Sequence, residues 1–168
     1  ARVAYGQPAD IDALYALPGG DNAPGTVAQM RESLVMKLGE KINVRRFEKM
    51  LAGKGHIGSY VHHGSKIGAL VMMEGGDETL ARDIAMHIAA SRPEYLSKEQ
   101  VPSAAISKEK EIFAEQAKAS GKPPEIIEKM VMGRVNKYLN EVTLLGQPFV
   151  KDPDTTVEKL LKPKGASV

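Results

Sequence analysis

The first clear pattern of hydrophobic and polar positions begins after Thr26. Apolar residues then recur every three to four positions until Gly39, which is the spacing of one helix face. Threonine is a favourable N-cap, and glycine commonly follows the last helical residue. The pattern predicts an amphipathic helix over residues 27–38. Residues 1–26 hold three prolines and several glycines, so we expect a flexible segment with little helix.

After this helix the spacing of apolar residues shortens to about two positions, which predicts a small sheet. Residues 41–50, 57–62 and 67–73 alternate or are rich in β-formers, and a turn at residues 63–65 joins the last two. Antiparallel neighbours need only a short connection. Helical spacing then returns and stops at Pro93. A three-stranded antiparallel sheet covered by helices is therefore expected.

The third region has a different character because charged residues dominate it. Residues 103–120 and 124–142 are each helical in pattern, and a glycine- and proline-containing loop joins them. Their apolar residues form a narrow seam, typical of antiparallel helix pairs. The seam consists of Ile112, Phe113, Ala117, Ile127, Val131, Val135 and Leu139. We predict a protruding helical hairpin, a coiled coil.

The remaining residues complete an α+β fold. Residues 144–150 are short and extended in pattern, and residues 156–161 form a brief helical pattern. The tail at residues 163–168 is expected to be frayed.

Composition narrows the function classes. The chain has 168 residues, 42% of them hydrophobic, with 23 basic and 21 acidic residues and a net charge of +2. No run of like charges suggests a nucleic-acid arm, and no apolar run approaches the roughly 18 residues that span a bilayer. Cysteine is absent, which excludes disulfides and thiolate metal sites and fits the cytoplasm. We expect no nucleic-acid and no membrane partner.

One glycine motif invites a cofactor interpretation. Gly53, Gly55 and Gly58 match the dinucleotide-binding spacing. In a true site a helix opens at the last glycine and its N-terminus faces the pyrophosphate. Here the motif lies between two predicted strands. We therefore interpret it as a glycine-rich turn and expect no cofactor.

Four histidines raise the possibility of a metal site or a catalyst. His62 and His63 are adjacent on a strand, so they point to opposite faces, and no acidic partner has a recognisable ligand spacing. His87 neighbours the apolar face of its helix and is expected to be hydrogen-bonded and half-buried. No nucleophile motif or phosphate loop is present. We expect no enzyme, and the eight methionines fit either core filling or an adaptable surface.

Several segments resemble the elongation factor Ts family. They are KLGEKINVRR at residues 37–46, GSY through KIG at residues 58–68, HIAASRPEY at residues 87–95, SGKP at residues 120–123, EKMV at residues 128–131 and GQPFV at residues 146–150. Their order and gaps also match the family, from about residue 27 to residue 162. The resemblance implies a guanine nucleotide exchange factor that binds the GTPase elongation factor Tu and holds no nucleotide itself.

The resemblance also implies a division into subdomains. Residues 27–52 correspond to a remnant of the N-terminal core subdomain. Residues 55–99 and 142–162 correspond to the C-terminal core subdomain, and residues 103–141 to its coiled coil.

Four residues are expected to bind the partner. In the family, the apolar residue and glycine before the INVRR segment press close to the phosphate loop of the GTPase, which implies Leu38 and Gly39 here. The alternative for this pair is a helix C-cap with its hydrophobic partner, and one residue can serve both purposes. Tyr60 and His62 correspond to positions where the C-terminal subdomain touches the GTPase.

Two segments of the family pattern have no counterpart in the sequence. These are the N-terminal helical domain with its Thr-Asp-Phe-Val segment, and the C-terminal module. We therefore expect a truncated core that binds elongation factor Tu with impaired exchange. A protein-interaction scaffold that docks a partner through the core or coiled coil, without exchange activity, is the alternative. An exposed strand edge at residues 41–50 would further permit self-association.

Overall fold

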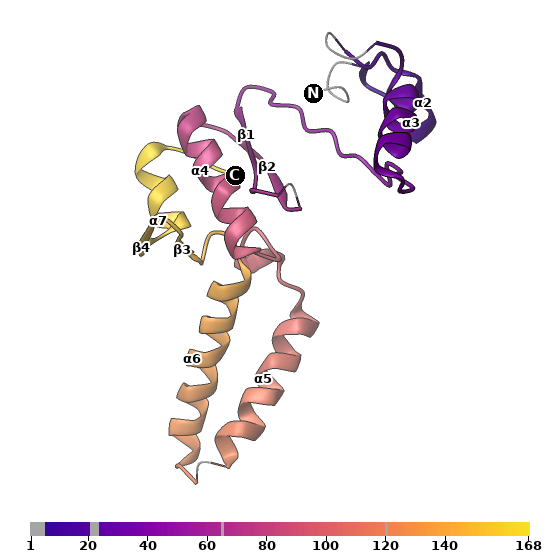
Figure 1. Cartoon of the computed structure of the whole chain (residues 1–168). Helices are drawn as coiled ribbons and strands as arrows, with labels where there is room; N and C mark the ends of the chain where they lie inside the picture. Colours follow the sequence, from indigo (N-terminus) through magenta and orange to yellow (C-terminus); the bar gives the residue numbers. More distant parts are fainter. Residues whose placement is uncertain (1–5, 21–23, 65, 120) are drawn as a thin grey trace. The chain divides into compact units, whose positions relative to one another are not determined.

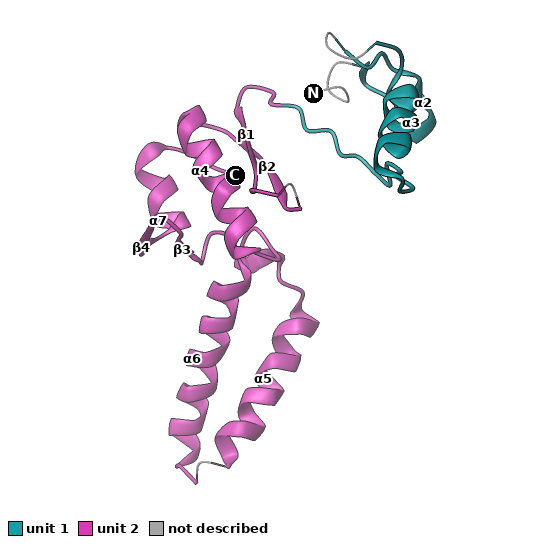
Figure 2. Ribbon diagram, viewed as in Figure 1, with its two compact units in different colours: residues 1–51 teal, residues 52–168 magenta. Residues whose placement is uncertain are grey.

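The structure is a computed structural model that describes residues 6–20, 24–64, 66–119 and 121–168. The chain divides into two units, Ala1–Leu51 and Ala52–Val168, which Figure 2 distinguishes by colour. Each unit is described by itself below. Parts of three predicted features lie outside the described residues: the N-terminal segment at residues 1–5 and 21–23, the turn residue Ser65 and the helix-end residue Ser120.

Unit 1 contains two described helices. Helix α2 (Ile11–Ala16) is capped by Asp10, whose carboxylate accepts a hydrogen bond from the backbone N–H of Ala13 at 2.8 Å. This short helix lies in a segment where we expected little helix, and the aspartate cap accounts for it because it satisfies a free N–H of the first turn. Helix α3 (Val27–Leu38) has a complete capping box between Thr26 and Gln29. The predicted bounds of α3 are confirmed.

Residues 41–50 form no strand, so the predicted three-stranded sheet is wrong on this point. Ile42, Val44 and Phe47 are half-buried while their neighbours are exposed, which explains the alternating pattern. The backbone N–H of Val44 donates to the hydroxyl of Tyr15 at 2.9 Å rather than to another strand. No described strand pairs with this segment. The strand edge on which we based self-association is therefore absent from this segment, and self-association itself stays a prediction, which sedimentation at several concentrations tests.

In unit 2, strands β1 (His56–Val61) and β2 (Gly68–Met73) form an antiparallel hairpin. Helix α4 (Glu78–Ser91) covers one face of it (Figure 1). Asp77 caps this helix by accepting from the N–H of Leu80 at 2.7 Å. A Cβ added to Gly58 would lie 2.0 Å from the carbonyl oxygen of Ala81, so only glycine permits this close packing of strand and helix.

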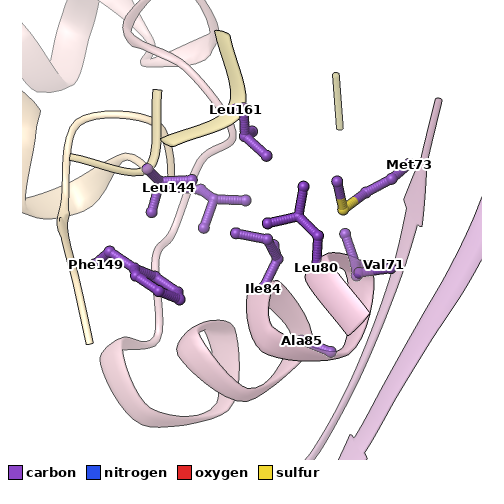
Figure 3. Packing of buried hydrophobic residues seen from close by; sticks show 10 residues of the cluster. Val71, Met73, Leu80, Ile84, Ala85, Leu144, Phe149 and Leu161 are labelled. Atoms are coloured by element: carbon purple, nitrogen blue, oxygen red, sulfur yellow. The ribbon is translucent and has the colours of Figure 1, made fainter. Parts of the chain in front are cut away.

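The larger of two hydrophobic clusters in the described part of unit 2 joins its hairpin, α4 and the C-terminal segments. Figure 3 shows its side chains pointing toward one another from β2, from α4 and from the segments that follow the helical hairpin. The buried members are Val71, Met73, Leu80, Ala81, Ile84, Ala85, Leu144, Phe149, Val157 and Leu161. The core therefore joins residues that lie far apart in the sequence.

Helices α5 (Ser103–Lys118) and α6 (Pro124–Val142) form the predicted helical hairpin (Figure 1). A single 3₁₀ turn, Lys98–Gln100, precedes it. Ala117, Val131 and Val135 are buried in the seam. Outside the seam most of both helices is exposed, as the charged composition predicts.

The last residues add a second small sheet and a final helix. Strands β3 (Pro148–Phe149) and β4 (Asp152–Thr156) are antiparallel, and helix α7 (Val157–Leu161) is followed by the 3₁₀ turn Lys162–Lys164. The tail differs from the frayed end that we expected. Ser167 and Glu74 exchange backbone hydrogen bonds of 2.8 and 3.0 Å, because the tail finds backbone groups just beyond β2.

Candidate partner-binding site

The end of α3 presents an apolar side chain beside a bare backbone. Leu38 is the last helical residue and is 59% exposed. Gly39 follows with φ of 71°, and its N–H donates to the carbonyl oxygen of Val35 at 2.9 Å. A Cβ added to Gly39 would meet no atom within 4 Å, so the positive φ, not crowding, favours glycine here. A partner can therefore approach this backbone closely.

The two interpretations of Leu38 and Gly39 can now be compared. The C-cap is present, since Gly39 has left-handed geometry and makes the capping hydrogen bond. The exposure of Leu38 shows that the cap leaves most of this side chain open to solvent. The same helix exposes Leu34 (47%) and Met36 (79%), and none of its residues is buried. Helix α3 thus ends in exposed apolar side chains that no described residue of unit 1 covers.

Tyr60 and His62 meet at the end of β1 in unit 2. The Tyr60 hydroxyl and Nδ1 of His62 are 3.1 Å apart, and their ring centroids are 6.1 Å apart. Tyr60 is half-buried against the core, whereas His62 is exposed. The N–H of His62 donates to the carbonyl oxygen of Ile67 at 2.9 Å, which extends the β1–β2 hairpin. The structure pairs Leu38 with Gly39 in one unit and Tyr60 with His62 in the other.

His87 is fully buried, where the sequence predicted only half burial. Its Nδ1 accepts from the backbone N–H of Val150 at 3.2 Å, and its Nε2 lies 3.0 Å from Oε1 of Gln147. Since a backbone N–H can only donate, Nε2 carries the proton and donates to Gln147. Burial lowers the pKa of His87, and the hydrogen bond with Gln147 raises it by less. The predicted hydrogen-bonded histidine is confirmed, and both of its nitrogens serve structural contacts.

Gln147 is a structural residue that sequence reasoning missed. Its amide nitrogen donates to the carbonyl oxygen of Glu141 at 2.6 Å and of Ser91 at 3.4 Å. These bonds link the ends of α4 and α6 to the imidazole of His87. A lone glutamine gives no signal in a sequence, because its partners are two backbone carbonyl groups and the side chain of His87, and only the fold brings them together.

The glycine motif has a structural account. Gly58 lies within β1, and no helix begins there. A Cβ on Gly55 would lie 2.0 Å from the carbonyl oxygen of Met73, and Gly53 has φ of 57°. The three glycines therefore serve a turn and two close backbone approaches.

Two further searches concern metals and membranes. Among the described residues, no three His, Asp or Glu side chains gather closely enough to hold a metal ion. None of the helices in the described segments combines the length and hydrophobicity needed to cross a membrane.

Comparison with known proteins supplies the family. The family model described as "Elongation factor TS" matches residues 1–168. Curated proteins named elongation factor Ts are 58% identical over 152 residues in Methylococcus capsulatus, covering 90% of this chain and 52% of that protein, and 54% identical over 167 residues in Thioalkalivibrio sulfidiphilus, covering 99% and 56%. The protein of Legionella pneumophila strain Lens is 57% identical over 143 residues, covering 85% and 48%. The chain thus spans about half the length of the curated relatives it matches. The match over the whole chain and these identities show that the chain belongs to the elongation factor Ts family.

Proposed function

We propose that this chain binds the GTPase elongation factor Tu and promotes release of its GDP. It acts by protein binding and has no active site of its own. The observation that carries the proposal is the exposed Leu38 beside the open backbone of Gly39, in a chain of the elongation factor Ts family. An apolar side chain next to a bare backbone suits insertion against a loop of another protein. The cytoplasm, where translation occurs, is the compartment we propose.

Linkage explains how binding alone can release a nucleotide. A protein that binds the nucleotide-free GTPase more tightly than the GDP form must weaken GDP binding by the same factor. The contacts must therefore differ between the two forms. In our proposal Leu38 and Gly39 press on the phosphate loop and supply that difference. In the same proposal Tyr60 and His62 add a second contact with the GTPase.

We propose that the two units act as different parts of the assembly with elongation factor Tu. We assign residues 27–52 to the N-terminal core subdomain. We assign residues 55–99 and 142–162 to the C-terminal core subdomain, and residues 103–141 to the coiled coil. In this assignment Leu38 and Gly39 act from the first subdomain, and Tyr60 and His62 act from the second.

The test measures release of fluorescent GDP from elongation factor Tu with the chain in excess, alongside a pull-down. We expect binding and accelerated release, at a lower rate than with a full-length relative because the chain supplies about half of its length. Leu38→Ala should weaken the effect roughly tenfold, since a leucine that becomes buried contributes about 1.5–3 kcal/mol. Met36→Ala is the matched control and should change little, because residues two positions apart on a helix do not share a face, so Met36 points away from Leu38.

The scaffold alternative has one observation in its favour. A groove of about 380 Å³ runs between α5 and α6, and its apolar floor includes Ala114, Ile127 and Val131. Binding without faster GDP release would support this alternative. Absence of binding to elongation factor Tu would contradict the exchange proposal.

A further inference from the structure

Tyr15 and Arg31 connect the helices of unit 1 to the segment that follows α3. The guanidinium carbon of Arg31 lies 5.3 Å from the centroid of the Tyr15 ring, which is a cation–π contact between α3 and α2. Nη1 of Arg31 donates to Oδ1 of Asn43 at 3.2 Å. The hydroxyl of Tyr15 accepts from the N–H of Val44 at 2.9 Å. Two stacked side chains therefore hold two consecutive residues of the outgoing chain.

These contacts fix the path of the chain after Gly39. Arg31 lies seven residues before Leu38 on the same helix, which is about 10 Å along the axis. The chain leaves α3 at Gly39 and returns far enough for Asn43 to reach Arg31. The turn between Gly39 and Asn43 is therefore anchored by the helix cap at one end and by the Tyr15–Arg31 pair at the other.

One nitrogen of the Arg31 guanidinium is held in an unfavourable environment. Its Nε is shielded from solvent and has no hydrogen-bond partner among the described residues. A shielded donor without an acceptor is unfavourable, so other contacts of the guanidinium must offset this cost. These are the Tyr15 ring, Asn43 and, at 3.8 Å, the carboxylate of Glu32. The return segment has no strand partner among the described residues, and the Tyr15 and Arg31 side chains replace the missing ladder.

We infer that Tyr15 and Arg31 are positioning residues for the partner-binding site. They hold the turn after Gly39 in one conformation, so that Leu38 and the Gly39 backbone meet elongation factor Tu already ordered. The inference rests on the proposed function. A site that is ordered before binding loses less conformational freedom on binding. Releasing the turn should therefore weaken binding without changing the contacts themselves.

The variants separate the hydroxyl from the guanidinium. Tyr15→Phe removes the acceptor of the Val44 N–H and keeps the ring. Arg31→Met keeps an unbranched apolar side chain and removes the guanidinium. The matched control is Arg134→Met in the helical hairpin. Arg134 also lies over an aromatic ring, 5.9 Å from the centroid of Phe113, and donates to Oε1 of Gln116 at 2.7 Å.

The readouts are the half-saturating concentration of the chain in fluorescent GDP release, the rate at saturation, and amide exchange of Val44. For Tyr15→Phe and Arg31→Met we expect the half-saturating concentration to rise roughly three- to tenfold, with the saturated rate nearly unchanged. Val44 should exchange faster in Tyr15→Phe. Arg134→Met should alter none of the three readouts.

A double-mutant cycle with Leu38→Ala distinguishes positioning from general stability. If the pair acts through Leu38, its effect shrinks when Leu38 is already alanine, so the two changes are not additive. Full additivity, or an equal effect of Arg134→Met, would overturn the inference and leave the proposed function intact. If the unaltered chain neither binds elongation factor Tu nor accelerates GDP release, the proposed function fails and the inference fails with it.

Discussion

Gly39 and Gly133 have similar surroundings but different backbones. An added Cβ would meet no atom within 4 Å at either position. Gly39 has φ of 71°, whereas Gly133 lies inside α6 with a helical backbone. Alanine is strained at a positive φ but is the better residue inside a helix.

We therefore predict opposite effects of Gly39→Ala and Gly133→Ala. Gly39→Ala should lower the stability of unit 1 by about 1 kcal/mol, because it strains the helix cap. Gly133→Ala should raise the stability of the helical hairpin by about 1 kcal/mol. Thermal melting followed by circular dichroism measures both changes. A loss of stability in Gly133→Ala would contradict the prediction for α6.

His87 makes the stability of unit 2 depend on pH. In the folded state burial lowers its pKa below the ordinary value of 6.5. The unfolded chain therefore binds more protons as the pH falls through 6.5, and the folded state loses stability. Protonation would also remove the acceptor of the Val150 N–H, since Nδ1 would then carry a hydrogen.

We predict that the free energy of unfolding in urea falls between pH 7.5 and pH 5 and that His87→Gln reduces this fall. His63→Gln is the control, because His63 is exposed. An unchanged pH dependence in His87→Gln would show that other groups cause it.

At the scale of elements, the helical hairpin and the core of unit 2 have separate hydrophobic clusters. Val131 is 4% exposed in the seam between α5 and α6. A carboxylate at this position would be buried without a partner, which disfavours the paired helices. The core around α4 shares no buried residue with this seam.

We therefore predict that Val131→Asp opens the hairpin and preserves the β1–β2–α4 core. Amide exchange should rise in α5 and α6 but not in α4. In our proposed function GDP release should be nearly unchanged, because Leu38 and Gly39 lie in unit 1. Met132→Asp is the control, because it places the same charge on the neighbouring residue, which is 50% exposed to solvent. Loss of all binding in Val131→Asp, with α4 still protected, would favour the scaffold alternative.

At the scale of the whole molecule, the two units differ in how much they bury. Leu14 is the one buried hydrophobic residue among the described residues of unit 1, whereas unit 2 has an extended core. Local opening costs less where few apolar contacts are lost. We predict that amides of α3 exchange roughly tenfold faster, or more, than those of α4, as measured by mass spectrometry. Equal protection of the two helices against amide exchange would contradict this prediction.

The sequence by itself determined the elements whose signals are local. Thr26 and Pro124 mark helix starts through a side-chain cap or a fixed φ, and the structure places α3 and α6 there. The β1–β2 hairpin was also predictable, because a short turn places each strand next to the strand that follows it in the sequence. Family membership was predictable from short segments of sequence such as those at residues 37–46 and 146–150. These features depend only on residues within a few positions of one another.

The tertiary structure alone decided features that depend on a distant partner. Alternation over residues 41–50 predicted a strand, but a strand needs a ladder, and Tyr15 took the Val44 N–H instead. Full burial of His87 required Gln147, which is 60 residues away. The path of the chain after Leu38 depends on the hydrogen bond that Arg31 donates to Asn43, twelve residues away. Periodicity reports which face of a segment is apolar, but it does not report which group, from which part of the chain, will satisfy it.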